Sequence, residues 1–268
     1  MAHGDFQLDV AAAKTAIVTG ASQGIGRRTA EVLAERGYDI LLTDVKGCEE
    51  TRAAVLATGR KAAEVVGDIS LESTARRVAE AVSKQFGTAD VLVNNAGLSH
   101  ICPAEKTTAA DWKRVQDVNL LGPFLLCREV GLIMLGQHRG SIINVSSVAG
   151  LLGISDRAAY NASKHGLIGL TRTLAAEWGG RGVRCNAVCP GWVKTPMDLA
   201  PQAAGLYNDA DIEGRIPMGR FASQDDIAAA IAFLADPAQS GFINGHTLSV
   251  DGGWFADGSW ETLRLRHR

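Results

Sequence analysis

Several features that would direct a chain to particular functions are scarce in these 268 residues. The formal net charge is only −2, so no basic surface for nucleic acid or for an anionic membrane is expected. No apolar run approaches the ~18 residues that would span a bilayer. The N-terminal MAHGDFQLDVAAAK contains two acids and lacks a basic start followed by a long apolar core, which argues against a secretion signal. We therefore predict a cytoplasmic protein with no nucleic-acid or membrane partner.

Cysteine is also scarce. The five cysteines (Cys48, Cys102, Cys127, Cys185 and Cys189) form no C-x-x-C pair and are odd in number, as expected for reduced thiols in a cytosolic protein. Cys185 and Cys189 would share one face of an extended strand. A metal or redox pair is one interpretation of this spacing, and apolar packing, which we favour, is the other. We predict no metal site.

What the sequence does contain is a regular alternation of short apolar runs with longer helical stretches. We expect strands at 15–20, 38–44, 62–66, 90–97, 141–147, 183–191 and 246–253, and helices at 25–36, 48–57, 71–86, 109–137, 157–178 and 224–236. Strands this apolar are buried on both faces, which predicts a parallel sheet covered by helices. The pattern indicates a single α/β domain over 1–268, with a Rossmann-type doubly wound sheet of about seven strands.

Two segments depart from this alternation. The stretch 192–220 contains three prolines and several small residues, so we expect a mobile flap over a pocket. The tail 254–268 extends past the last expected strand, and its Trp254 and Trp260 favour docking against another subunit. The arginines of the tail would either reach an anionic group on a substrate in a neighbouring subunit or form a frayed charged end.

The turn TGASQGIG (19–26) joins the first expected strand to the first expected helix. Gly20 would permit the tight turn, Gly24 would let the backbone approach a pyrophosphate, and Gly26 would allow close packing of helix on sheet. The N-terminus of the helix would offer its free N–H groups to the phosphates. The spacing is G-x-x-x-G-x-G and not G-x-G-x-x-G, but its position between strand and helix predicts nucleotide binding.

Two acidic residues follow the next two expected strands. Asp44 stands 20 residues beyond Gly24, where an acid would accept hydrogen bonds from an adenosine ribose and repel a 2′-phosphate. This favours NAD over NADP, although Lys46 could offset the repulsion. Asp68 would either contact the adenine amino group or cap the helix expected near Ser70.

Tyr160 and Lys164 are four residues apart within an expected helix, so their side chains would share one face. A free tyrosine has a pKa near ~10 and is a poor base at neutral pH. A lysine nearby favours the phenolate and moves that pKa toward the working range. The pair therefore suggests proton transfer to or from an alcohol.

Several motifs in this chain occur together and in a characteristic order. They are TGASQGIG (19–26), NNAG (94–97), Asn119 in DVNLLGPF, Ser147 in NVSSVAG, Tyr160-x-x-x-Lys164 and PGWVKTP (190–196). From about residue 14 to 253 the chain resembles the short-chain dehydrogenase/reductase family. The resemblance implies that Tyr160 exchanges a proton with the substrate oxygen, while Lys164 depresses the tyrosine's pKa and binds the nicotinamide ribose.

The same resemblance implies roles for two more residues. Ser147 would hydrogen-bond the substrate oxygen, and Asn119 would hold a water that links Lys164 to solvent. Ser147 is preferred over Ser146 because the family's usual interval from this serine to the tyrosine is 13 residues, which separates Ser147 from Tyr160. Adjacent side chains on a strand face opposite sides, so only one of the two serines can serve.

The resemblance further implies which residues contact cofactor and substrate. Cofactor contacts are expected from Gly20, Ser22, Gln23, Gly24, Ile25, Gly26, Asp44, Asp68, Ile69, Asn95, Ala96, Gly97, Tyr160, Lys164, Pro190, Gly191, Val193 and Thr195. Substrate contacts are expected from Ser147, Tyr160, His100 and Trp192, with Ser99, Leu152, Ile154, Asp156, Met197 and Leu199 in the surrounding loops. Alternatively, His100 is a solvated loop residue, Trp192 packs under the flap, and Asn94 and Asn95 form only a turn.

Taken together, these features predict an NAD-dependent oxidoreductase that interconverts a secondary alcohol and a ketone. A pocket of mixed polarity suggests a sugar, a polyol or a small cyclic alcohol as substrate. One alternative is a 3-oxoacyl-[acyl-carrier-protein] reductase, and an alternative of another class is a non-catalytic NAD-sensing regulator. The family resemblance implies a homotetramer, with a dimer as the alternative.

Overall fold

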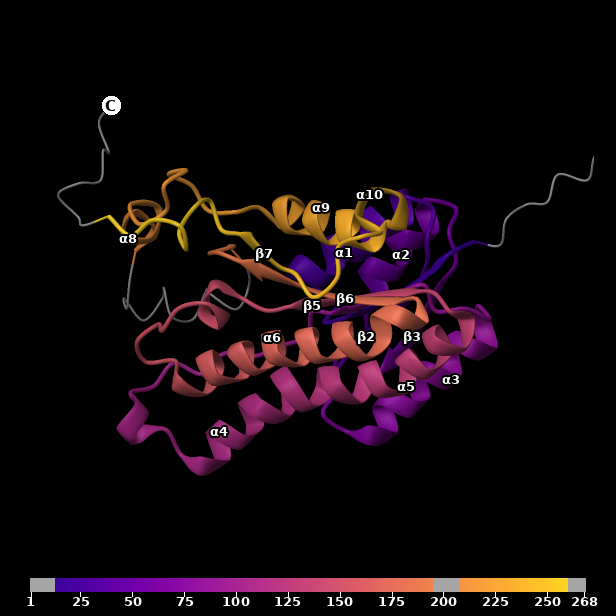
Figure 1. The fold of residues 1–268 in the computed structure, drawn as a ribbon, viewed down its shortest axis with the longest axis horizontal. Helices are drawn as coiled ribbons and strands as arrows, with labels where there is room; N and C mark the ends of the chain where they lie inside the picture. Colours follow the sequence, from indigo (N-terminus) through magenta and orange to yellow (C-terminus); the bar gives the residue numbers. More distant parts are fainter. Residues whose placement is uncertain (1–12, 195–207, 260–268) are drawn as a thin grey trace, which may run out of the picture.

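A seven-stranded parallel sheet forms the centre of the molecule (Figure 1). The computed structural model describes residues 13–194 and 208–259. The strands are β1 (Thr15–Thr19), β2 (Asp39–Asp44), β3 (Ala62–Val66), β4 (Val91–Asn94), β5 (Gly140–Val145), β6 (Val183–Pro190) and β7 (Thr247–Val250). Their order is β3-β2-β1-β4-β5-β6-β7, so the direction of winding reverses between β1 and β4. The predicted doubly wound parallel sheet in a single α/β domain is confirmed.

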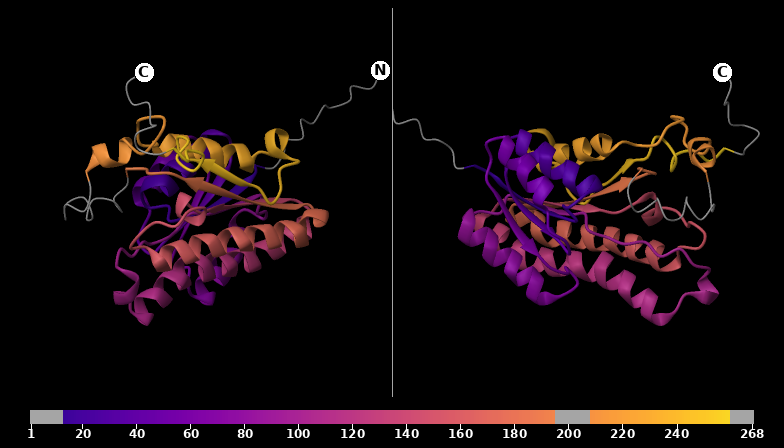
Figure 2. Two further views of the ribbon diagram at one scale, coloured as in Figure 1. Left: turned by 60° about the vertical axis from the view of Figure 1, so that its left-hand side comes forward. Right: turned by 180° about the vertical axis from the view of Figure 1, so that it is seen from behind.

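Helices cover both faces of the sheet and give the molecule three layers (Figures 1 and 2). One face carries α1 (Gly24–Glu35), α2 (Glu49–Ala57), α9 (Gln224–Ala235) and α10 (Pro237–Ser240). The other face carries α3 (Glu72–Gln85), α4 (Ala109–Gln116), α5 (Gly122–Gln137) and α6 (Ala158–Trp178). The short helix α8 (Asp209–Glu213) lies beside the segment that follows β7 (Figure 1).

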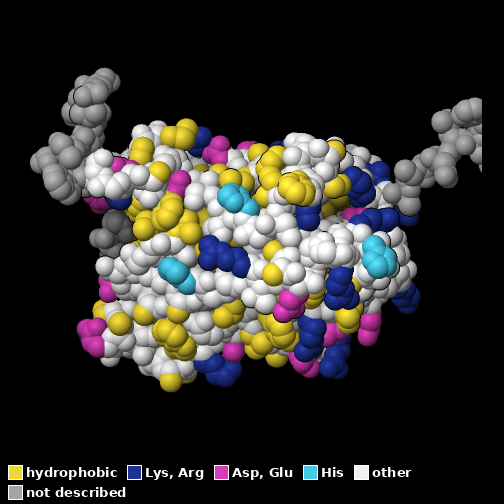
Figure 3. Space-filling model, viewed as in Figure 1, with side chains coloured by type: hydrophobic (Ala, Val, Ile, Leu, Met, Phe, Trp, Pro, Cys, Tyr) yellow, Lys and Arg dark blue, Asp and Glu magenta, His cyan; other side chains and the backbone are white. Residues whose placement is uncertain are grey.

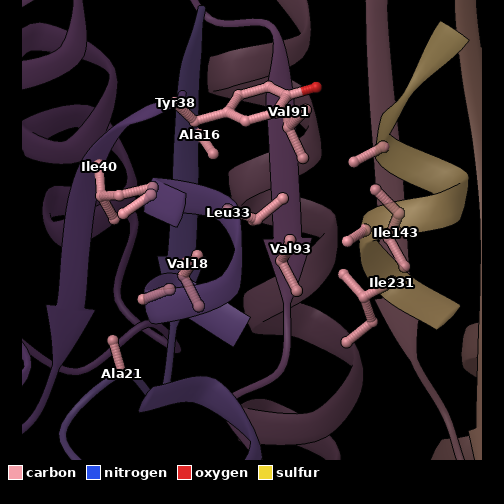
Figure 4. Packing of buried hydrophobic residues seen from close by; sticks show 14 of the residues in the cluster. Ala16, Val18, Ala21, Leu33, Tyr38, Ile40, Val91, Val93, Ile143 and Ile231 are labelled. Atoms are coloured by element: carbon pink, nitrogen blue, oxygen red, sulfur yellow. The ribbon is translucent and has the colours of Figure 1, made fainter. Parts of the chain in front are cut away.

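The sheet is apolar on both faces because each face is covered by helices. Val18 and Val93 belong to a buried cluster that includes Leu33 of α1 and residues of α9 (Figure 4). Neighbouring residues on the same strands, Ile17 and Leu92, belong to a second cluster with α3, α5 and α6. Successive side chains of a strand point to opposite faces, so a strand that is covered twice must be apolar throughout.

The expected helix over 109–137 contains a π turn (Asp117–Leu121) that the sequence pattern did not predict. Pro123, in the first turn of α5, has no N–H to donate to the carbonyl of Asn119, four residues earlier. An α-helical hydrogen bond is therefore impossible at this point, and a wider turn is favoured. The π turn carries Asn119, whose side chain is fully buried.

The same stretch is the one part of the described residues with the length and composition of a membrane span. Ala109–Gln137 includes an 18-residue window of mean hydropathy 1.6, interrupted by Arg128 and Glu129. Of this window, 56% is buried inside the domain, where α5 packs against α3 and α6. The stretch is therefore a core helix. It is nevertheless more apolar than we expected from the sequence, where no apolar run approached the length of a membrane span.

The predicted flap and tail are described only in part, because 195–207 and 260–268 lie outside the described residues, together with Trp260 and the tail's arginines. The described parts of the two segments pack on each other. Nη1 of Arg215 donates to Oδ2 of Asp257 in the tail at 3.2 Å. The segment after β7 is therefore joined to the segment that precedes α9.

Acidic and basic side chains are interspersed on the face shown in Figure 3, in keeping with the small net charge. All five cysteines are free thiols. Cys185 and Cys189 are fully buried in apolar clusters, and burial raises the pKa of both thiols. No group of three or more His, Cys, Asp or Glu among the described residues could hold a metal ion.

Candidate active site

A cleft of ≈ 830 Å³ opens at the carboxyl ends of the strands, around the point where the winding reverses. Of the predicted site residues, those that line the cleft are Gly20, Ser22, Gln23, Gly24, Ile25, Asp44, Asp68, Ile69, Asn95, Ala96, Gly97, Ser147, Tyr160, Lys164, Pro190, Gly191, Trp192 and Val193. Gly26, Asn119 and His100 are not part of the lining. Thr195 lies outside the described residues.

The turn after β1 has a backbone that requires glycine. Gly20 and Gly24 have φ of +65° and +60°, the left-handed region that residues with a side chain rarely adopt. A Cβ on Gly26 would lie 2.1 Å from the carbonyl oxygen of Gly20, so α1 can begin against the turn only because residue 26 has no side chain. Gln23, at the N-cap of α1, makes no side-chain capping hydrogen bond. The amides of the first turn therefore remain available, and the turn fits a pyrophosphate.

Asn95 connects the turn after β4 to this glycine turn. Its Nδ2 donates to the carbonyls of Thr19 at 2.9 Å and of Gly20 at 3.3 Å. The backbone N–H groups of Asn95 and Ala96 both donate to the hydroxyl of Thr19. Asn95 thus fixes the floor of the cleft, whereas Asn94 is the last residue of β4 and its Nδ2 donates to Oδ1 of Asn144 at 2.8 Å, so the two asparagines do not form only a turn.

Asp44 stands at the rim of the cleft, at the end of β2. Its Oδ2 accepts a hydrogen bond from the N–H of Ser22 at 3.1 Å, and its Oδ1 accepts one from the N–H of Lys46 at 3.2 Å. Each carboxylate oxygen can accept a second hydrogen bond. The carboxylate is therefore held in place next to the glycine turn and can still accept hydrogen bonds from a ligand. Lys46 also lines the cleft.

Asp68 lines the cleft after β3. Its Oδ1 accepts hydrogen bonds from the backbone N–H and the hydroxyl of Ser70, at 2.9 and 2.7 Å. The alternative role as a helix cap is wrong, because α3 begins at Glu72 and has Leu71 at its N-cap, with no side-chain capping bond. The carboxylate instead forms a tight turn ahead of the helix.

Tyr160 and Lys164 lie one turn apart in α6, and both line the cleft. Lys164 is 4% exposed, its Nζ donates to the carbonyl of Val145 at 2.8 Å, and the same Nζ lies 5.6 Å from the centroid of the Tyr160 ring. Burial lowers the pKa of Lys164 to about 8, because the protein interior disfavours the charged form. At neutral pH the side-chain amine of Lys164 therefore remains mostly in its protonated, ammonium form.

The two adjacent serines after β5 make different contacts. Ser146 is buried, and its hydroxyl donates to the backbone carbonyl of Lys164 at 3.0 Å. The hydroxyl oxygen of Ser147 accepts a hydrogen bond from the N–H of Ala149 at 3.1 Å. This contact leaves the hydroxyl proton of Ser147 available to donate to a ligand in the cleft.

The side chain of Asn119 holds the loop after β4 in place through hydrogen bonds. Its Oδ1 accepts from the N–H of Leu98, and its Nδ2 donates to the carbonyl of the same residue, both at 2.9 Å. Nδ2 also donates to the hydroxyl of Ser163 at 3.1 Å. The side-chain amide is thus occupied by protein groups, so the predicted water-holding role would fall to the backbone carbonyl in the π turn.

The end of the cleft near Tyr160 is walled by Trp192, whose ring stacks on that of Trp254 with centroids 6.2 Å apart and planes 10° apart. Arg157 covers the Trp192 ring, with its guanidinium carbon 5.4 Å from the ring centroid. Ser99 and Ile154 also line the cleft, whereas Leu152 and Asp156 do not. Met197 and Leu199 lie outside the described residues.

His100 lies on the loop after β4, next to this end of the cleft. Its Nε2 is buried and has no hydrogen-bond partner among the described residues. The solvated loop histidine of the alternative interpretation therefore does not describe this ring nitrogen. A substrate contact through His100 stays a prediction.

Comparison with known proteins identifies the family. Residues 20–255 match the family described as enoyl-(acyl carrier protein) reductase. D-threitol dehydrogenase of Mycolicibacterium smegmatis is 42% identical over 253 residues, covering 93% of this chain and 95% of the relative. The chain belongs to the short-chain dehydrogenase/reductase family.

Two further members of the short-chain dehydrogenase/reductase family extend the comparison. Cis-4-hydroxycyclohexanecarboxylate dehydrogenase of Sinomonas cyclohexanicum is 38% identical, covering 91% of this chain and 98% of that protein. A solved structure from Beutenbergia cavernae, a candidate NAD(P)-dependent gluconate 5-dehydrogenase with NADP bound at low occupancy, matches with a TM-score of 0.85 at 40% identity, covering 92% and 98% of the two chains. The present chain is an NAD(P)-dependent short-chain dehydrogenase/reductase that acts on CH–OH groups.

Sequence reasoning missed some residues that line the cleft. Lys113 and Arg114 of α4 reach it, and so does Arg157, which immediately precedes α6. No short motif marks the first two, because only the packing of α4 beside the cleft brings them there. Arg157 carried a usable signal, since it precedes Tyr160 by three residues within the family's catalytic segment.

Proposed function

We propose that this protein is an NAD-dependent dehydrogenase that interconverts a secondary alcohol and a ketone, on a sugar, a polyol or a small cyclic alcohol. The observation that carries the proposal is the meeting of Tyr160 and the buried Lys164 in the same cleft as the glycine turn at Gly20 and Gly24. This arrangement supports an acid/base pair that would act beside a bound nicotinamide nucleotide. The nucleotide, when bound, supplies the hydride acceptor or donor.

In alcohol oxidation, Tyr160 accepts the hydroxyl proton of the substrate through its phenolic oxygen. The ammonium of Lys164, 5.6 Å from the ring centroid, favours the phenolate by its positive charge. Because Lys164 is buried, solvent screens this interaction only weakly. In ketone reduction, the same phenol returns the proton.

Ser147 donates its hydroxyl proton to the substrate oxygen and so holds that oxygen beside Tyr160. Its hydroxyl oxygen is itself oriented by the N–H of Ala149. Asn119 fixes the loop after β4 through Leu98, and its backbone carbonyl would hold the water that links Lys164 to solvent. Ser147 and Asn119 thus act by positioning the reacting groups.

The preference for NAD over NADP rests on Asp44. Its carboxylate is fixed at the rim of the cleft by the N–H of Ser22, where it would accept hydrogen bonds from an adenosine ribose and repel a 2′-phosphate. Lys46, two residues on, also lines the cleft and opposes this repulsion. We give the acid more weight because backbone hydrogen bonds hold it in place, whereas the Lys46 side chain is exposed.

The cleft walls and two similar proteins support the proposed substrate class. Trp192 and Ile154 present apolar surface, and Ser99 and Arg157 present polar groups, which suits a hydroxylated compound of modest size. Two of the similar proteins are D-threitol dehydrogenase and cis-4-hydroxycyclohexanecarboxylate dehydrogenase, which act on a polyol and on a hydroxylated ring, although a 3-oxoacyl-[acyl-carrier-protein] reductase is also similar, at 36% identity. We therefore propose a polyol, sugar or cyclic alcohol and not a long acyl chain.

A turnover screen tests the proposed function. Sugars, polyols, cyclic alcohols and 3-oxoacyl thioesters would each be assayed with both cofactors, in the direction of oxidation or reduction that suits each compound. We expect NAD-dependent oxidation of an alcohol. Faster NADPH-dependent reduction of 3-oxoacyl thioesters would favour the reductase alternative. NAD binding without turnover of any compound would favour the regulator alternative.

We further propose a cytoplasmic homotetramer, with a dimer as the alternative. Large apolar side chains are exposed on the outer face of α4 and α5, among them Trp112 at 41%, Phe124 at 41% and Leu132 at 65%. Exposed apolar groups that lie along two consecutive helices favour burial against a second copy of the chain. Light scattering coupled to gel filtration would give the mass, and a monomer would contradict this part of the proposal.

A further inference from the structure

Arg157 places a positive charge in the cleft beside Tyr160. The residue is half-buried and forms the N-cap of α6. Its guanidinium carbon lies over the ring of Trp192, 5.4 Å from the ring centroid, and its Nη1 donates to the hydroxyl of Ser99 at 3.0 Å. Within residues 13–194 and 208–259, no Asp or Glu forms an ion pair with it. A guanidinium has five N–H donors, so most of its donors are left for a ligand.

The surroundings hold Arg157 in one position. Its backbone pairs with Cys102 in a short parallel bridge, and the N–H of Cys102 donates to the carbonyl of Asp156 at 2.8 Å. Asp156 itself has φ of +59°, a conformation that few non-glycine residues adopt. The ring that covers the guanidinium is fixed in turn by its stacking on Trp254. The cation is therefore preorganised before any substrate binds.

The charge of Arg157 does little for the stability of the fold. It stands at the N-terminus of a 21-residue helix, the end at which the helix dipole disfavours a cation. The first turn of α6 contains no acidic residue that would compensate. Arg215, at the other end of the same stack, does have a carboxylate partner. It covers Trp254 and also pairs with Asp257 at 3.2 Å. Among the described residues, no carboxylate therefore competes with an anionic ligand for the half-buried Arg157.

We propose that Arg157 binds a carboxylate of the substrate, so that the preferred substrates are hydroxy acids. This rests on the proposed function, in which Tyr160 takes the proton of the substrate hydroxyl. The planar guanidinium matches a carboxylate through two parallel hydrogen bonds, and the one side-chain hydrogen bond that it makes to a described residue is from Nη1 to Ser99. Arg157 and Tyr160 line the same cleft, so a substrate whose hydroxyl contacts Tyr160 can present its carboxylate to Arg157.

The test compares cis-4-hydroxycyclohexanecarboxylate with its methyl ester, which lacks the negative charge and carries one additional methyl group. For the wild-type protein we expect kcat/KM to be higher for the acid by at least about tenfold, as for one charge-assisted hydrogen-bonded pair. Arg157→Gln should lower kcat/KM for the acid by about 10- to 100-fold and change that for the ester by less than about threefold. Arg157→Lys keeps the positive charge but loses the paired N–H groups of the guanidinium. Its kcat/KM for the acid should lie between those of the wild type and of Arg157→Gln.

Arg172→Gln is the matched control, because Arg172 is an exposed residue of the same helix and does not line the cleft. This variant should keep the wild-type preference for the acid. Equal use of acid and ester by the wild-type protein, or an equal loss on both in Arg157→Gln, would overturn the proposal. A preference for a sugar phosphate over the acid would overturn the choice of carboxylate.

A binding measurement separates failure of this proposal from failure of the proposed function. Cyclohexanecarboxylate has no hydroxyl group to oxidise, and its binding to the protein with NADH can be followed by calorimetry. We expect Arg157→Gln to weaken this binding by about tenfold or more. If no alcohol is turned over, the proposed function fails, but the calorimetry still tests Arg157. Equal affinity in both proteins would overturn its role.

Discussion

Replacing Lys164 by methionine should remove a pH dependence of stability that the wild-type protein has. Burial lowers the pKa of Lys164 from 10.5 to about 8, while the unfolded chain keeps the ordinary value. Between these two values the unfolded state binds more protons than the folded state, so the free energy of unfolding rises with pH. The difference between these two pKa values corresponds to about 3 kcal/mol in the free energy of unfolding. About 2 to 3 kcal/mol of this change falls between pH 7 and 10.

Below pH 8 both states carry the proton, and the folded state bears the full cost of burying the charge. Above that pH the folded state releases the proton first, and the cost disappears. Lys164→Met has no such group, although it loses the hydrogen bond to the carbonyl of Val145, which is worth about 1 to 3 kcal/mol. The free energies of unfolding of the wild type and of Lys164→Met should therefore differ little at pH 7. At pH 10 the wild type should be the more stable of the two.

Urea unfolding at one protein concentration, from pH 7 to 10, measures the free energies for both proteins in the absence of cofactor. The informative quantity is the difference between wild type and variant at each pH. Lys84→Met, at an exposed position of α3, is the control and should give a difference that does not change with pH. If the difference for Lys164→Met also stayed constant within about 0.5 kcal/mol, the lysine would not be a buried charge.

Two other substitutions probe the cofactor end of the cleft. Gly26→Ala would place a Cβ 2.1 Å from the carbonyl oxygen of Gly20, so the turn must move. The Kd for NADH, measured by fluorescence titration, should therefore rise by at least about tenfold. The control is Gly169→Ala, where nothing lies within 4 Å of the new Cβ, and this variant should leave the Kd for NADH unchanged. Asp44→Ala should narrow the ratio of kcat/KM for NAD over NADP by about tenfold or more, and an unchanged ratio would remove Asp44 from the ribose site.

The fold could be predicted from the sequence because its physical signals are local. Apolar runs buried on both faces and regular helical stretches between them lead to a parallel sheet, and each expected strand is present to within a few residues. The π turn at Asp117–Leu121 was missed. It depends on one absent amide hydrogen, at Pro123, in a segment whose hydrophobic pattern is otherwise that of one long helix.

The candidate site was predictable where the residues lie close in sequence. The glycine turn and the Tyr160–Lys164 pair follow from short-range spacing, and the choice of Ser147 over Ser146 follows from the family's interval to Tyr160. The stacking of Trp192 on Trp254 and the covering of Trp192 by Arg157 join segments that are far apart in the chain. Such contacts depend on how three loops meet at the end of the sheet, which no local pattern specifies.

The proposed reaction depends most directly on the phenol of Tyr160 as the proton donor and acceptor. Steady-state turnover and NADH binding would be measured on Tyr160→Phe beside the wild type, with an alcohol found in the substrate screen. We expect the Kd for NADH to stay within about threefold while kcat falls by about 10²- to 10⁴-fold, the range of general acid–base catalysis. A variant that kept a tenth of the wild-type kcat would contradict the acid/base role of Tyr160.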